Sequence, residues 1–358
     1  MNIQNRRVFL LFLLCALLLC ACAQKSKPEV QQGQIYLYGE KHADPKCLEK
    51  ELARWGELYA DGSRHLFVEM PCYMASNLNE WMHADSDDIL DQLYRDSAGT
   101  QSNTPDVLDF YRQIKQNYPE TVFHGTDVGH LFDSMGVRRL AEMRSAGQEK
   151  SEDYMLVQEI AEQGRTFYAM ERHNEPDCYA YRENCMAENF IREYERLSGE
   201  NVMGIYGAMH TDPESMDISG QVDSMAKQLA ARYGDALHTE NLSYADPVRT
   251  DRLLVGGKEY EATYYGSQES SQGGMRYRQR DFWRLENAYE DFADCPLTGE
   301  VLPYNNYPIK IEENQVYVID YTGIDGTVER RYYRTDGFVW NNLPSTQAFS
   351  VGDYSDPA

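Results

Sequence analysis

The sequence predicts an α/β protein with a mostly parallel sheet of βαβ units, flanking helices and a β-rich C-terminal region. Two observations support this fold class. Short apolar runs rich in β-branched and aromatic residues alternate with longer helical patterns through the first two thirds of the chain. Strands separated by helices favour parallel βαβ units. After about Asp246 the chain changes to frequent Gly, many Tyr and alternating segments.

Four apolar runs are expected to form the sheet, because each is short and stops at Gly or Pro, or just before one. They are residues 34–38, 65–70, 121–125 and 201–206. The stretches between them carry helical patterns, notably residues 45–59, 104–117, 175–197 and 220–233. Ligands of such sheets bind beyond the carboxyl ends of the strands, so the residues that follow the runs are candidates for a site.

The C-terminal region, residues 246–358, is expected to be an appendage to an α/β domain of residues 34–245. Segments 315–321 and 327–334 alternate apolar and polar residues on either side of Asp325-Gly326. That pair favours a hairpin turn. The many aromatic residues here are expected to pack against one another rather than to form a ligand platform.

The first 21 residues are expected to be a secretion signal. Arg6 and Arg7 precede a run from Val8 to Cys22 that contains no charge. About 20 apolar residues are needed to span a bilayer, so this shorter run is typical of a cleaved signal. Its last four residues, Leu-Cys-Ala-Cys, resemble the bacterial lipobox.

Cys22 is therefore the expected lipidation site, carrying acyl chains such as palmitate. Residues 22–33 are polar and are expected to be a tether. This arrangement predicts an extracytoplasmic protein held by lipid at the cell membrane or the outer membrane.

The chain is strongly acidic, with a formal net charge of −24. Nucleic acid would repel such a polyanion, and no basic stripe compensates, so nucleic acid is not an expected partner. Anionic lipid head groups would also repel the protein surface, so membrane attachment must come from the acyl chains. The expected partners are the membrane, through the lipid, and a small-molecule or peptide ligand.

Five cysteines follow the signal and Cys22: Cys47, Cys72, Cys178, Cys185 and Cys295. An odd number leaves at least one thiol unpaired in an oxidising compartment. Cys47 and Cys72 each follow a strand of the same expected sheet, so a disulfide between them is a hypothesis. Cys178 and Cys185 lie about 10 Å apart on an expected helix, which is too far for a bridge.

Polar residues follow three of the expected strands. The first leads to Gly39-Glu40-Lys41-His42, the second contains Glu69, and the fourth leads to Gly207-Ala208-Met209-His210. Imidazole and carboxylate groups are ligands for Zn, Mn, Co or Fe, and each glycine lets the backbone turn sharply. Without a metal, the same groups would act as general base and acid around a bound water.

These motifs resemble a known superfamily over roughly residues 34–212. Residues 39–44 are similar to the start of the ChaN-like haem-binding lipoproteins and, more loosely, to the erythromycin esterases. Residues 182–189, Arg-Glu-Asn-Cys-Met-Ala-Glu-Asn, resemble a helix motif found in both groups. Residues 207–210 are similar to the second Gly-x-x-His of the TraB/TIKI families, which include metal-dependent proteases. His42 lies one residue closer to its Gly-Glu pair than the esterase histidine does, which disfavours a macrolide esterase.

The resemblance implies that Arg182 holds a carboxylate or an oxyanion near His210, a task that suits the planar fork of arginine. A structural Arg182, paired with Glu69 or Asp127, is the alternative. Helix periodicity gives an independent expectation. Positions i, i+4 and i+7 lie on one face of a helix, and here they are Arg182, Met186 and Asn189. Met186 is therefore expected to pack against the sheet, with the other two beside it.

Several other polar residues are weaker candidates. Asp127 resembles an acidic residue of the esterases, or it caps a helix that begins near Leu131. His124 follows the third expected strand together with Asp127, and His130 and His173 are expected to be structural or exposed.

The first functional hypothesis is an extracytoplasmic, metal-assisted hydrolase of peptide or ester bonds. His42 and His210 would bind a divalent metal with Glu40 or Glu69, which lowers the pKa of a bound water towards ~7. The carboxylate that is not a ligand would be the general base. Arg182 would stabilise the oxyanion.

The second hypothesis is a binding protein for haem or another iron cofactor, without catalysis. Haem would need an apolar pocket and an axial ligand, for which Tyr38 and Tyr73 are available. The third hypothesis is a surface lipoprotein that has kept the fold but lost the functional site.

Overall fold

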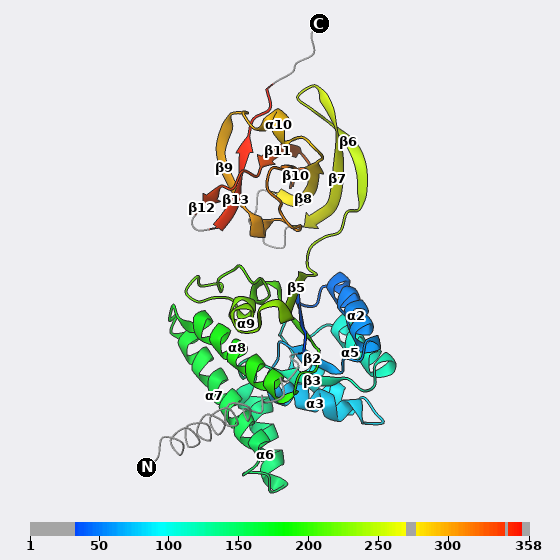
Figure 1. The fold of residues 1–358 in the computed structure, drawn as a ribbon, viewed down its shortest axis with the longest axis vertical. Helices are drawn as coiled ribbons and strands as arrows, with labels where there is room; N and C mark the ends of the chain where they lie inside the picture. The colour runs from blue at the N-terminus through cyan, green and yellow to red at the C-terminus, as the bar shows by residue number, and fades with distance from the viewer. Residues whose placement is uncertain (1–32, 270–276, 341–342, 353–358) are drawn as a thin grey trace, which may run out of the picture. The chain divides into compact units, whose positions relative to one another are not determined.

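A computed structural model describes residues 33–269, 277–340 and 343–352 (Figure 1). The expected signal peptide, Cys22 and most of the tether lie outside these residues. In the described part, no helix is long and apolar enough to cross a bilayer. The chain forms two compact units. The described parts of segments 1–37, 54–100 and 111–239 form the first unit, and those of 38–53, 101–110 and 240–358 form the second.

A five-stranded sheet confirms the predicted α/β class. Its strand order is β3-β2-β4-β1-β5, and β2 runs parallel to both β3 and β4. The strands are β1 (Ile35–Glu40), β2 (His65–Val68), β3 (Val122–Gly125), β4 (Val202–Gly207) and β5 (Leu237–Asn241). All four predicted runs form strands. The second ends at Val68 rather than Met70, because the chain turns there and the Met70 N–H donates to the Val68 carbonyl at 2.8 Å.

Three helices match predicted ones: α2 (Pro45–Ala60), α5 (Pro105–Asn117) and α8 (Cys178–Arg196). The predicted helix 220–233 is shorter, since α9 spans Met225–Tyr233 and Ser224 caps it by accepting the Lys227 N–H at 3.1 Å. The other helices before β5 are α3 (Cys72–Met82), α4 (Asp88–Asp96), the π-helix η1 (Phe132–Gly136), α6 (Val137–Ser145), α7 (Glu152–Arg172), and the 3₁₀ turns η2 (Ala208–His210) and η3 (Gly234–Ala236).

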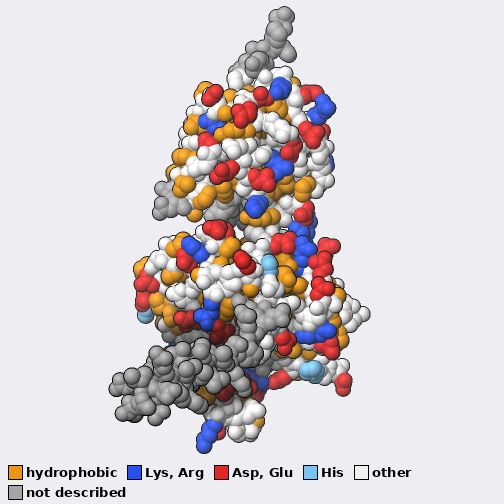
Figure 2. All heavy atoms as spheres, in the orientation of Figure 1, with side chains coloured by type: hydrophobic (Ala, Val, Ile, Leu, Met, Phe, Trp, Pro, Cys, Tyr) orange, Lys and Arg blue, Asp and Glu red, His pale blue; other side chains and the backbone are white. Residues whose placement is uncertain are grey.

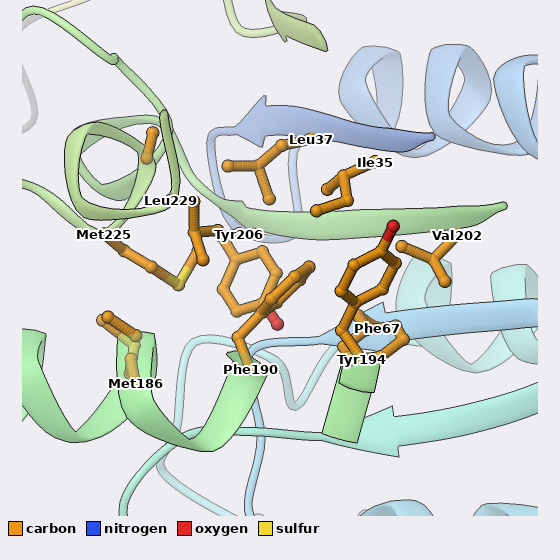
Figure 3. Packing of buried hydrophobic residues seen from close by; sticks show 12 residues of the cluster. Ile35, Leu37, Phe67, Met186, Phe190, Tyr194, Val202, Tyr206, Met225 and Leu229 are labelled. Carbon is orange, nitrogen blue, oxygen red and sulfur yellow. The ribbon is translucent and has the colours of Figure 1, made fainter. Parts of the chain in front are cut away.

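Helices α8 and α9 cover one face of the sheet (Figure 3). Met186 and Phe190 of α8 pack with Met225 and Leu229 of α9 against apolar residues of the strands, among them Leu37, Phe67 and Tyr206. Met186 is fully buried, which confirms its predicted place against the sheet. Each such buried side chain contributes about 1.5–3 kcal/mol, so this packing fixes the position of α8.

The second unit contains the β-rich C-terminal region, with strand order β12-β13-β11-β10-β8-β7-β6 and β9 paired to β13. The elements are β6 (Arg249–Val255), β7 (Lys258–Glu269), β8 (Tyr277–Leu285), α10 (Tyr289–Phe292), β9 (Leu297–Pro303), η4 (Tyr304–Asn306), β10 (Val316–Gly323), β11 (Val328–Arg334), β12 (Val339–Trp340) and β13 (Leu343–Phe349). The predicted hairpin is β10–β11, with Gly326 at φ +84° in its turn. Both faces of β10 are buried, Val318 on one and Tyr317 on the other, so the aromatic residues pack as predicted.

Charged side chains of both signs are mixed on one face of the molecule (Figure 2). On the face shown in Figure 2, Lys and Arg lie scattered among Asp and Glu and do not gather in a single patch.

All five cysteines of the described residues are free thiols. The disulfide hypothesised between Cys47 and Cys72 is therefore wrong. Both residues lie on helices that follow their strands, where Cys47 donates to the Leu242 carbonyl at 3.7 Å and Cys72 begins α3. Burial raises the pKa of Cys47 to about 11 and of Cys72 to about 12, which keeps both thiols protonated and unreactive.

Helix α7 touches the loop after β3 at two glycines. A Cβ on Gly164 would lie 2.0 Å from the Gly129 carbonyl oxygen. We expect Gly164→Ala to lower the free energy of unfolding by about 1–3 kcal/mol, because the helix must move off the loop. Urea denaturation measures this loss. Glu171→Ala, on the exposed side of the same helix, is the control and should change stability by less than about 0.5 kcal/mol. Equal midpoints would contradict the close packing.

His65 of β2 and His124 of β3 share a hydrogen bond of 2.9 Å between their rings. Burial and the neighbouring His124 lower the pKa of His65, although Glu200 opposes them. The unfolded state then binds the proton more readily, so stability falls as pH drops through the unfolded pKa of about 6.5. We expect the urea midpoint to decrease between about pH 7 and 5, and His65→Gln to weaken that decrease. An identical pH dependence in the variant would contradict this assignment.

Candidate functional site

The candidate site lies in the first unit, beyond the carboxyl ends of β2, β3 and β4. Glu69 follows β2, Asp127 follows β3, and His210 ends the turn η2 after β4. The first half of α8 adds Arg182 and Glu183. We call these five residues the Arg182 cluster. The structure thus brings together three of the predicted site residues, Glu69, Arg182 and His210.

Arg182 holds two carboxylates at once. Its Nε and Nη2 donate to the two oxygens of Asp127 at 3.0 and 2.6 Å, and Nη2 also donates to Glu69 Oε1 at 2.6 Å. Burial alone would raise the pKa of Asp127, but Arg182 and His130 hold it well below its usual range. The two carboxylates raise the pKa of Arg182 in spite of its burial. The ion pairs expected for a structural Arg182 are therefore present, with both Asp127 and Glu69.

His210 lies between two carboxylates. Its Nδ1 is 2.6 Å from Glu183 Oε2, and its Nε2 is 3.7 Å from Glu69 Oε1 and 3.5 Å from Arg182 Nη1. Burial would lower the pKa of His210, but Glu69 and Glu183 raise it above the usual 6.5. Because Glu183 accepts from Nδ1–H, Nε2 is the nitrogen that gains and loses the proton. A protonated Nε2 is attracted to Glu69, and a neutral Nε2 accepts from Arg182.

Backbone groups fix both carboxylates that contact His210. Glu183 is only 2% exposed, and its Oε1 accepts the Met225 N–H at 2.5 Å. Glu69 Oε2 accepts the Gly207 N–H at 2.6 Å. Both oxygens of Glu69 are thus occupied by donors, one from the Arg182 side chain and one from the backbone. This geometry favours a positioning role for Glu69 over the predicted general base.

His130 and Tyr168 extend the cluster, a role that sequence reasoning missed. His130 Nε2 contacts Asp127 Oδ2 at 2.8 Å, and its Nδ1 contacts the Tyr168 hydroxyl at 2.5 Å. The spacing Asp127-x-x-His130 was the available signal. Asp127 does not cap a helix: η1 follows Leu131, and no side chain caps it.

Glu40 and His42 form a pair of their own, with Glu40 Oε1 2.8 Å from His42 Nδ1. Both belong to the stretch 38–53 of the second unit. Glu51, 1% exposed, also interacts with Glu40, and its burial together with that neighbour raises the pKa of Glu51 well above its usual range. That His42 shares a site with His210 stays a prediction.

The residues around His210 do not fit a divalent metal. Within the ranges that the structure describes, no group of three or more His, Cys, Asp or Glu is arranged to hold a metal ion. The guanidinium of Arg182 lies 2.6 Å from Glu69 and 3.5 Å from His210, so it places a positive charge where a cation would bind. Electrostatic repulsion therefore disfavours a second cation there.

The two tyrosines considered as haem ligands are both buried. Tyr73 is fully buried, and its hydroxyl donates to the His130 carbonyl at 2.5 Å. This contact occupies the oxygen that an iron atom would need. Haem binding stays a prediction, and no contact in the described residues favours it.

No family model matches the chain, and no curated protein matches its sequence. Solved structures with a similar chain path include a Bacillus cereus protein, at 13% identity and a TM-score of 0.46 over 91% of this chain and 93% of the other. A succinoglycan biosynthesis protein matches at 15% identity and 0.42, over 67% and 73%. An erythromycin esterase mutant in its open conformation matches at 12% identity and 0.43, over 72% and 84%. At these values the likenesses carry no argument about function.

Proposed function

We propose that the protein is a hydrolase of ester or peptide bonds in which His210 transfers the proton and Arg182 stabilises the developing negative charge. One observation carries this proposal. A histidine that titrates above its usual pKa is held at Nδ1 by a buried carboxylate, with Nε2 beside a fixed guanidinium. Perturbed titratable groups held in this way are typical of functional sites.

The proposed reaction uses the two protonation states of His210. Neutral Nε2 accepts a proton from the attacking water, and the resulting imidazolium donates it to the leaving group. Such acid–base catalysis contributes about 10²–10⁴ in rate. Glu183 stabilises the imidazolium at Nδ1, as the acid of a catalytic triad does.

Arg182 supplies electrostatic stabilisation from a fixed position. Because Nε and Nη2 are held by Asp127 and Glu69, Nη1 is oriented before the substrate arrives. A preorganised donor next to the reacting nitrogen stabilises an oxyanion without paying for reorganisation. The proposal needs no metal at His210.

The proposed location is outside the cytoplasm, with the chain anchored by lipid on Cys22. The basic start, the short apolar run and the lipobox-like Cys support this part of the proposal. Metabolic labelling with palmitate tests it directly. The wild type should incorporate the label and Cys22→Ser should not, whereas equal labelling would refute the anchor.

Hydrolysis is tested on the full-length chain in detergent, with a panel of p-nitrophenyl esters and short peptides. We expect turnover by the wild type and its loss in His210→Ala. His173→Ala, at a side chain 75% exposed, is the matched control and should keep the activity. Turnover that survives EDTA supports the proposal, and turnover that EDTA abolishes and Zn²⁺ restores would replace it with metal-assisted hydrolysis. A saturable Soret shift on adding haem, without turnover, would favour haem binding.

A further inference from the structure

The loop between η2 and α9, residues 211–224, closes on itself next to the Arg182 cluster. The Ser224 hydroxyl donates to the Asp212 carbonyl at 2.6 Å, so the two ends of the loop meet. The next residue, Met225, donates its N–H to Glu183 at 2.5 Å. Compact loops whose ends meet are frequently functional. This loop directly follows His210, and the residue after it binds the Glu183 carboxylate that contacts His210.

The buried side chain of Asp217 binds the backbone of this loop from the inside. Asp217, 5% exposed, accepts the backbone N–H groups of Ser219, Gln221 and Val222 at 3.1, 2.9 and 3.1 Å. The Gln221 side chain donates to the Pro176 carbonyl at 2.9 Å, just before α8. The loop is therefore fixed both internally and to the helix that carries Arg182.

Apolar side chains project outwards from the same loop and its neighbours. Ile218 is 67% exposed and Met216 38% exposed. Met209, which directly precedes His210, is 46% exposed, and Tyr179, one turn before Glu183 on α8, is 42% exposed. We call these four residues the apolar ledge. Asp217 is buried inside the loop, whereas Met216 and Ile218 on either side of it are exposed together with the polar residues Asp212 and Glu214.

We propose that the apolar ledge binds the apolar part of the substrate, an acyl or alkyl chain attached to the bond that is hydrolysed. This inference rests on the proposed function. Exposed apolar groups next to a catalytic cluster mark a ligand surface, and methionine adapts to varied apolar shapes. Met209 directly precedes His210 in the chain, and Met225, the residue after the loop, binds Glu183, so the loop is connected to the reacting groups at both of its ends.

The test is a chain-length series of p-nitrophenyl esters from acetate to octanoate, hydrolysed by the full-length chain. We expect kcat/KM to rise about two- to fourfold for each added methylene, as burial of a methylene predicts. The double variant Met216→Ser, Ile218→Ser should lower the octanoate-to-acetate ratio of kcat/KM by about tenfold. The matched control is Val137→Ser, Met155→Ser, at apolar residues 55% and 53% exposed on α6 and α7, which should leave the ratio unchanged.

Three outcomes are decisive. A ratio that falls in the ledge variant alone supports the ledge. Turnover of all esters with a flat series, or a ratio equal in both variants, overturns the ledge and leaves the hydrolase. If no ester or peptide is hydrolysed, calorimetric titration with octanamide is the deciding measurement. Saturable binding that the ledge variant weakens would support the apolar site without the reaction. Absence of binding would overturn both the apolar site and the hydrolase.

Discussion

His210→Asn is expected to lower kcat/KM for the proposed hydrolysis by about 10²–10⁴. Asparagine is smaller, and its amide can still donate to Glu183, but it has no titrating nitrogen. The proton then has no carrier between water and leaving group. Steady-state kinetics on the best ester of the panel measures the loss, and a variant that kept most of the activity would exclude His210 as the acid–base group.

A substitution of Glu183, which contacts His210 Nδ1, tests the acid–base role of His210 in a second way. In Glu183→Gln the imidazolium loses a carboxylate that raises its pKa, so the acid limb of the kcat/KM profile should move to lower pH. Glu195→Gln, at a half-exposed residue of the same helix, should leave the limb in place. An unmoved limb in both variants would mean that the titration belongs to another group.

Arg182→Met is expected to lower the free energy of unfolding of the first unit by about 3–5 kcal/mol. Methionine replaces the apolar stem but leaves Asp127, 1% exposed, without its main counter-charge. A buried carboxylate in that state must be protonated or drawn towards water, and both cost stability. Two of the four tryptophans, Trp55 and Trp81, are fully buried in this unit, so its unfolding contributes to the change of tryptophan fluorescence in urea.

Two further variants test whether the loss of stability comes from the uncompensated charge of Asp127 or from the removal of any arginine. Arg165→Met removes a guanidinium that is 56% exposed and pairs with Glu162 on the surface, where such pairs contribute about 0–1 kcal/mol. Adding Asp127→Asn to Arg182→Met should restore part of the stability, because the uncompensated charge disappears. Similar losses in Arg165→Met and Arg182→Met would contradict a buried ion network.

The grouping of Glu69, Arg182 and His210 could be predicted because parallel strands end at one edge and the i, i+4, i+7 pattern orients α8. The role of Glu183 could not. Neighbouring residues on a helix point about 100° apart, and the sequence does not reveal that Arg182 meets the β3 loop while Glu183 meets α9.

Other differences have similar physical causes. Strand β5 was not predicted, because the middle of Leu237–Asn241 is exposed and polar at the sheet edge and lacks an apolar alternation. The hypothesised disulfide failed because a shared sheet does not specify where a thiol points. Cys47 contacts the Leu242 carbonyl, a partner far along the chain.

The long sequence separations within the Arg182 cluster bear on the order of folding. Arg182 lies 55 residues after Asp127 and 113 after Glu69. During synthesis both carboxylates emerge well before their guanidinium, and desolvating them early is unfavourable. Premature collapse of this region is thereby penalised, and the ion network closes only when α8 docks. We expect hydrogen exchange during refolding to show late protection of the Asp127 loop, which makes this charge cluster a late step of assembly.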